Sequence, residues 1–153
     1  MLPLTLALHA LAAVVWVGGM AFAYGILRPV AGSTLAGPER LALWHGVFSR
    51  FFRVVWVAVA VLLATGYYMT LVPFGGFAQV GLHIHTMHGL ALLMAAIFAH
   101  LFFAPWQRFR RAVDQGENES AGVELGRIRT LVALNLTLGL IVVVVATAGR
   151  YWY

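Results

Sequence analysis

The chain contains no cysteine and no lysine, and only five of its 153 residues are acidic. The absence of cysteine excludes disulfides, thiolate zinc sites, iron–sulfur clusters and thiol nucleophiles. All five acidic residues lie outside the long apolar stretches. No carboxylate or lysine within those stretches is therefore available as a proton carrier or a ligand, and histidine is the main ligand type left there.

Charged residues make up only 10% of the chain, whereas 62% of it is hydrophobic. This composition is typical of membrane proteins rather than of soluble domains. The net charge of +5 would suggest nucleic-acid binding in a soluble chain. Here the basic residues are arginines that flank apolar stretches, which is typical of topology signals. We therefore expect a lipid bilayer, and no nucleic acid, as the partner.

Four apolar stretches, at residues 4–27, 54–72, 85–103 and 131–149, are long enough to cross about 30 Å of hydrocarbon as helices of roughly 20 residues. No positive segment precedes the first stretch, which also outlasts a signal-peptide core of about 7–15 residues, so we expect a retained helix. The sequence predicts one all-α domain over residues 1–153, an integral membrane four-helix up-down bundle.

Two segments between these stretches are less apolar. Residues 39–53 are amphipathic, which indicates either an interfacial helix or an extension of the second membrane helix. Residues 107–127 are polar and are expected to form a solvated loop.

The arginines predict the orientation of the bundle. Nine of them surround the first and third connections, and only Arg150 lies at the other end. Because positive loops remain in the cytoplasm, both termini and residues 73–84 should face the outer, periplasmic side of a bacterial inner membrane.

The six histidines divide into two groups along the predicted helices. An outer group lies near the uncharged end of the bundle, and an inner pair lies near the arginines: His9, His83, His85 and His88, and then His45 and His100. Polar side chains within a bilayer normally face the bundle interior or a cavity. Each member of the pair His9 and His88 lies deep in a helix and is flanked by alanines. We expect these two to face each other as ligands, with His85 as the substitute if the third helix is rotated.

Two kinds of ligand fit these histidines, because imidazole binds both iron and copper. Haem b needs axial ligands, a flat apolar slot and cations for its propionates. His9 and His88 would supply the ligands and Arg150 the cation, and a second haem could lie at His45 and His100. The alternative is copper, held at the outer mouth by His83, His85, Met87 and His88.

Four short motifs carry a resemblance to known families: "LHALAAVVWVGGMAF", "LLATGYYM", "GLHIH" and "RFRRAV…GENES". They resemble CopD-type copper-resistance membrane proteins and are similar to HemJ-type protoporphyrinogen oxidases. The first resemblance implies copper uptake or tolerance. The second implies a four-helix protein that binds haem b through His9, but it departs at His83-Ile84-His85, where HemJ-type proteins carry His–x–Lys. The histidines also resemble, more loosely, those of small di-haem membrane cytochromes.

These observations favour a b-type haem membrane protein with a redox role. Bis-histidine ligation leaves no open iron position, which favours electron transfer over oxygen activation. Its partners would be a quinol, a porphyrinogen, a small oxidant or a periplasmic redox protein, and whether it is an oxidoreductase enzyme stays open. A CopD-like copper protein is the alternative, and a purely structural membrane subunit is the third hypothesis. A homodimer is compatible with all three.

Overall fold

The computed structural model describes the backbone of residues 1–151 and every side chain in that range except that of Arg150. All regular elements in this range are helical. In chain order they are α1 (Leu2–Ala13), η1 (Val14–Gly18), α2 (Gly19–Phe22), η2 (Ala23–Leu27), α3 (Arg28–Thr34), α4 (Gly37–Leu71), η3 (Phe77–Gln79), α5 (Leu82–Phe103), α6 (Pro105–Asp114), α7 (Asn118–Ala148) and η4 (Gly149–Tyr151).

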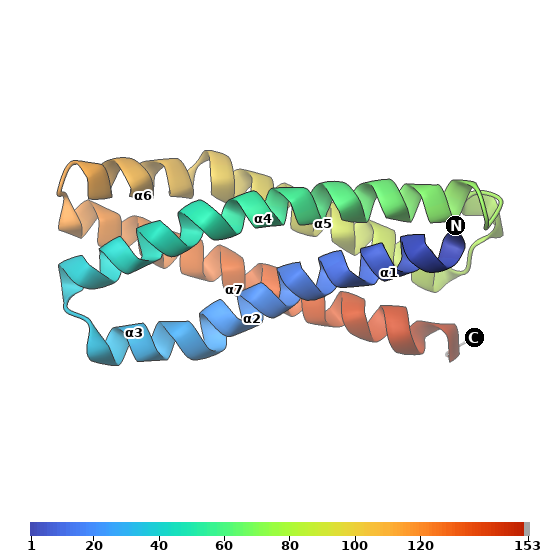
Figure 1. Ribbon diagram of the computed structural model, residues 1–153, viewed down its shortest axis with the longest axis horizontal. Helices are drawn as coiled ribbons and strands as arrows, with labels where there is room; N and C mark the ends of the chain where they lie inside the picture. Colours follow the sequence, from blue (N-terminus) through green and yellow to red (C-terminus); the bar gives the residue numbers. More distant parts are fainter. Residues whose placement is uncertain (152–153) are drawn as a thin grey trace.

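These elements form four long helical segments, which run side by side (Figure 1). Each is long and apolar enough to cross a membrane: Leu2–Thr34, Gly37–Leu71, Leu82–Asp114 and Asn118–Ala148. The expectation of an all-α four-helix membrane bundle is therefore confirmed. Both termini lie at the same end (Figure 1), and the side of the membrane that this end faces stays a prediction.

The helices are longer than the apolar stretches. The first segment continues as far as Thr34, and α4 begins at Gly37, so residues 39–53 form a continuous extension of the second membrane helix. The start of α4 is fixed locally, because the carboxylate of Glu39 accepts a hydrogen bond of 3.2 Å from the backbone N–H of Ala36. This interaction satisfies one of the unpaired donors of the first turn.

The expectation of a solvated loop over residues 107–127 is wrong. Most of this stretch is helical, in α6 and the first turns of α7, and the turn between them contains Gly116 at a φ of +74°. Packing overrides the polar composition, because Phe109 and Ala121 are both fully buried where these helices meet. Glu124 is also buried there and pairs with Arg108 at 3.0 Å.

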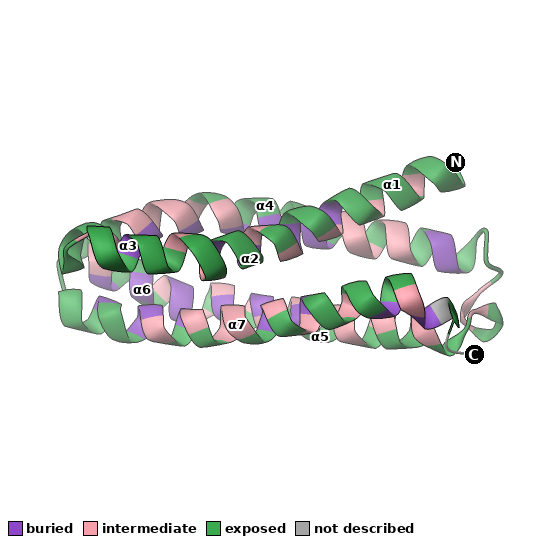
Figure 2. Cartoon of the chain, turned by 90° about the horizontal axis from the view of Figure 1, so that it is seen from below, coloured by how far each residue is buried: buried purple, intermediate pink, exposed green. Residues whose placement is uncertain are grey.

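The core is densest at the end of the bundle that carries the arginines. Phe48 and Phe52 of α4 stack with ring centroids 5.0 Å apart, and Trp106 of α6 meets Phe52 edge-on at 5.4 Å. Figure 2 shows buried residues gathered around α4 and α6 and, toward the termini, α1 with α4 separating from α5 with α7. The two ends of the bundle are therefore packed differently.

Two stretches of the first segment, η1 and η2, are π-helical. Such wide turns are rare and occur frequently at functional sites. Trp16 of η1 is buried and contacts the ring of Phe98 on α5 edge-on, with centroids 6.2 Å apart. The first segment is thus tied to the aromatic core at this wide turn.

An amide and a glycine join α5 and α7 halfway along the bundle. Asn135 is 2% exposed, and its Nδ2 donates a hydrogen bond of 3.1 Å to the carbonyl oxygen of Met94. One turn later, a Cβ added to Gly139 would lie 2.8 Å from Cγ2 of Val17 and 3.2 Å from Cε of Met94. Small residues permit this kind of close approach in a membrane, where association depends on packing.

Replacing Gly139 with alanine should destabilise the bundle by about 1–3 kcal/mol, the usual cost of overpacking. Val17 is β-branched and cannot readily rotate away from the new methyl group. The measurement is thermal unfolding of the purified protein in detergent.

Gly122→Ala is the matched control on the same helix, because a Cβ at Gly122 meets nothing within 4 Å. It should leave the midpoint unchanged or raise it, since alanine is the better helix former. Equal midpoints for the two variants would contradict this account of the η1–α5–α7 contact.

Candidate functional site

His9 lies on α1 and packs against α4. Its Nδ1 is 2.8 Å from the hydroxyl oxygen of Thr65. Gly66 leaves space for the ring, since a Cβ added there would come within 3.4 Å of Cε1 of His9. The imidazole is half-buried, and its position is therefore set by the Thr65–Gly66 pair.

The hydrogen bonds of Thr65 determine which nitrogen of His9 carries the proton. The Thr65 hydroxyl has one proton, which it donates to the carbonyl oxygen of Val61 at 2.6 Å. With its proton used in this way the hydroxyl accepts from His9, which favours Nδ1 of the imidazole as the donor. In the neutral ring Nε2 then carries a free lone pair, the form in which histidine binds a metal ion.

His88 and His85 lie on neighbouring parts of α5 and share an aromatic partner. Nε2 of His88 is 3.2 Å from the hydroxyl oxygen of Tyr67, and the two ring centroids are 5.0 Å apart. Phe77 of η3 contacts both histidines, at centroid distances of 5.2 Å to His88 and 6.0 Å to His85. The structure thus brings together three aromatic or imidazole rings at the start of α5, beside Tyr67 of α4.

His83 lies apart from these rings, against the end of α7. A Cβ added to Gly149 would lie 2.8 Å from Cβ of His83, so the glycine permits this contact. Met87 follows His83 by four residues, which places both on one face of α5, because residues at this spacing are neighbours on a helix surface. His85 and His88, three residues apart, form a second such pair.

The predicted partners His9 and His88 lie at the same level of α4 but against different sides of it. Thr65 and Tyr67, which contact them, are two residues apart and thus about 200° apart around the helix. No hydrogen bond or ring contact joins the two histidines within residues 1–151. In the described part of the chain, no three histidine or acidic side chains lie close enough together to hold a metal ion. Shared ligation by His9 and His88 stays a prediction.

At the other end of the bundle, His45 packs among aromatic rings. Its ring centroid is 5.6 Å from that of Trp106 and 6.5 Å from that of Phe109. Nε2 is 3.9 Å from a carboxylate oxygen of Asp114, an ion pair when the ring is protonated. His45 thus packs against Trp106 and Phe109 of α6, independently of any ligand.

The remaining predicted residues have fewer contacts. The side chain of His100 is exposed, and it forms no hydrogen bond or ring contact with the residues that the structure describes, including His45. The side chain of Arg150 lies outside the described residues. A second ligand site at His45 and His100 and a role for Arg150 stay predictions.

The sequence did not reveal which side chains contact the histidines. These are Thr65 at His9, Tyr67 at His88, and Phe77 at both His85 and His88. Thr65 is nevertheless a hydroxyl within an apolar run and directly precedes Gly66. A polar residue and a small residue together at membrane depth often mark a close helix contact. That signal could have identified the partner of His9, whereas Phe77 becomes visible only through the path of the connecting loop.

One comparison with known proteins finds a match. The family model CopD, copper resistance protein D, matches residues 45–148, about two thirds of the chain. This range contains the start of α5 with His83, His85, Met87 and His88, but it does not reach His9. Neither the curated proteins nor the solved structures give a match, and the comparisons do not show the HemJ-type relationship.

We expect the ¹⁵N NMR spectrum of histidine-labelled protein to show His9 with its proton on Nδ1. Thr65→Val removes the acceptor that fixes this tautomer, so the population with the proton on Nε2 should rise. Thr137→Val is the control, because its exposed hydroxyl donates only to the Ala133 carbonyl of its own helix. A wild-type resonance with the proton on Nε2 would contradict the assignment.

Proposed function

The chain belongs to the copper resistance protein D family, and from this premise we propose that it is a multi-pass membrane protein that binds copper ions in copper uptake or tolerance. The observation that carries the proposal is the place of the family match. It includes all four residues of the histidine- and methionine-rich start of α5. The expectation of a multi-pass membrane protein in a lipid bilayer agrees with the four long apolar helices.

The first two turns of α5 would capture the ion. Imidazole and thioether groups are the ligands that suit copper, and thioethers select copper(I) in particular. His83 with Met87 and His85 with His88 provide two pairs at helical spacings of four and three residues. Each pair could hold one ion at low coordination number, the first facing the end of α7 and the second facing Phe77 and Tyr67.

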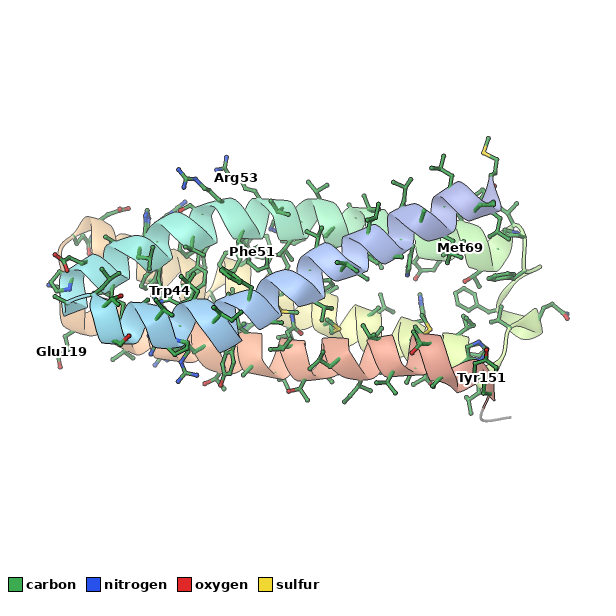
Figure 3. The ribbon with its side chains drawn as sticks, turned by 60° about the horizontal axis from the view of Figure 1, so that its bottom comes forward. Trp44, Phe51, Arg53, Met69, Glu119 and Tyr151 are labelled. Atoms are coloured by element: carbon green, nitrogen blue, oxygen red, sulfur yellow. The ribbon has the colours of Figure 1, made fainter. Side chains whose placement is uncertain are left out.

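His9 and Met69 would provide the next position in the bundle. Nε2 of His9 carries the free lone pair, because Nδ1 is bonded to Thr65. Met69 is buried and follows Thr65 by four residues on α4, so it shares the face that contacts His9. Figure 3 shows Met69 near the end of α4, close to the start of the first segment. A histidine and a thioether on adjacent helices form a soft site of the same type.

The haem hypothesis makes different use of the same histidines. It would place one haem b on His9 and His88 and a second on His45 and His100, with electron transfer to a quinone or a periplasmic redox partner. The family match supports copper rather than haem. Haem is therefore the alternative outcome of the experiment below.

We expect protein purified from copper-supplemented cells to contain copper and to show no b-type α-band in its reduced-minus-oxidised spectrum. In a copper(I) titration against a chromophoric chelator, His88→Ala and His83→Ala should each weaken binding by at least about tenfold, since even second-shell losses cost about 10–100-fold. Metal content per chain is measured in parallel.

His100→Ala is the control, because it removes an exposed histidine of the same helix and should leave the copper affinity unchanged. A sharp b-type band that is lost in both His9→Ala and His88→Ala, with iron bound in place of copper, would establish the haem protein instead. Unaltered copper affinity in both His83→Ala and His88→Ala would reject the proposed ligands.

A further inference from the structure

The phenol of Tyr67 on α4 lies against one ring nitrogen of His88 on α5. Its hydroxyl oxygen is 3.2 Å from Nε2, and the two rings are nearly perpendicular, at 83°, with their centroids 5.0 Å apart. The hydroxyl forms no other hydrogen bond with the residues that the structure describes. This bond therefore links α4 to α5 at the level of the pair His85 and His88.

The bond occupies the nitrogen through which His88 would bind a metal ion. A neutral imidazole has one N–H group and one bare nitrogen, and a metal ion binds the bare nitrogen. The phenolic O–H is the more acidic of the two possible donors, so the hydroxyl of Tyr67 donates and Nε2 of His88 accepts. The ring proton then lies on Nδ1. An ion that binds His88 through Nε2 has to displace the hydroxyl first.

His9 has the opposite arrangement. Thr65 is bonded to Nδ1 of His9, at 2.8 Å, and leaves Nε2 without a partner from this hydroxyl. Tyr67, two residues later on the same helix, is bonded to Nε2 of His88. Helix α4 thus supplies both partners, and it covers the Nε2 atom of one histidine while leaving that of the other open.

Tyr67 lies where its hydroxyl can leave Nε2 at little cost. The side chain is exposed and close to the end of α4, at the level where tyrosine hydroxyls of membrane helices meet interfacial water. Its ring contacts Phe77 edge-on, with centroids 6.1 Å apart. Phe77 follows Gly75 and Gly76, which have φ angles of +77° and +104°. A released hydroxyl is solvated there, so displacement leaves no buried donor without an acceptor.

We propose that Tyr67 competes with the copper ion for Nε2 of His88 and so weakens the first copper site of the chain. The inference rests on the proposed copper binding at the start of α5. When only a fraction of the free protein is competent to bind, the apparent affinity falls by that fraction. An ion held weakly at His88 passes on to His9, whose Nε2 has no such competitor.

The test is the variant Tyr67→Phe, which keeps the ring beside His88 and Phe77 but removes the hydroxyl. Its copper(I) affinity should be about two- to tenfold higher than that of wild-type protein, the factor that corresponds to one hydrogen bond. The measurement is a copper(I) titration of the full chain in detergent against a chromophoric chelator. A gain in affinity is a specific result, because damage to ligands or to packing would lower the affinity.

Tyr68→Phe is the matched control. Tyr68 is 37% exposed and Tyr67 38%, but the Tyr68 hydroxyl forms no hydrogen bond with the described residues, so its loss should leave the affinity unchanged. An unchanged affinity in Tyr67→Phe as well would overturn the inference. A loss of about 10–100-fold in Tyr67→Phe would also overturn it, because Tyr67 would then accept from Nε2 and orient His88 as a supporting partner of the site.

The metal-free protein gives a second readout by ¹⁵N NMR of labelled histidine. The resonances that disappear in His88→Ala should show the proton on Nδ1 in wild-type protein, and Tyr67→Phe should lower the population of this tautomer. A wild-type His88 with its proton on Nε2 would overturn the inference without any tyrosine variant. If wild-type protein binds copper through His88 but Tyr67→Phe shows no gain, this inference alone fails. If wild-type protein binds no copper, the proposed function fails with it.

Discussion

The hydrocarbon of a membrane offers no hydrogen bonds, so each polar group of this bundle that lies within it needs a partner from the protein. The bond from His9 to Thr65, at 2.8 Å, and that from Nδ2 of Asn135 to the Met94 carbonyl, at 3.1 Å, meet this requirement for those groups, whereas the buried Oδ1 of Asn135 has no partner among the described residues. The two bonds also join α1 to α4 and α5 to α7, the two helix pairs of the structure. The bonds that satisfy these polar groups thus link helices that lie side by side. The His9 bond through Nδ1 also leaves Nε2 of the imidazole without a hydrogen bond to Thr65.

This constraint also explains why the two ends of the bundle differ. Charges gather at one end, where Glu124 forms ion pairs with both Arg108 and Arg127, and where aromatic rings pack between α4 and α6. At the other end the polar groups include imidazoles, hydroxyls and thioethers, and the two helix pairs separate (Figure 2). The proposed site for a soft metal cation lies at the second end, away from the arginines. The charged side chains and the histidine and methionine side chains thus lie mainly at opposite ends of the bundle.

The sequence predicted the number of membrane helices and their all-helical class, because long apolar stretches and flanking arginines are strong, local signals. It failed over residues 107–127, where composition indicated a loop. The burial of Phe109 and Ala121 and the pairing of Glu124 with Arg108 depend on contacts between α6 and α7, which no local pattern reveals. The candidate site was predicted in part. The histidines themselves were found, but helical spacing alone could not show that His9 and His88 contact different sides of α4, since the rotation of each helix is set by packing.

The absences in the sequence bear most directly on which metal suits this protein. Magnesium, calcium and manganese prefer carboxylate and carbonyl oxygens, and the apolar stretches contain no acidic residue. Structural zinc sites close with four ligands, commonly thiolates, and this chain has no cysteine. Imidazole and thioether groups in pairs remain, and such pairs favour copper(I).

A protein that passes an ion onward also needs sites that release it, because binding must be weak enough for the ion to leave. The proposed two-ligand pairs on the first two turns of α5, followed by His9 and Met69 on neighbouring helices, would satisfy that requirement better than one closed site.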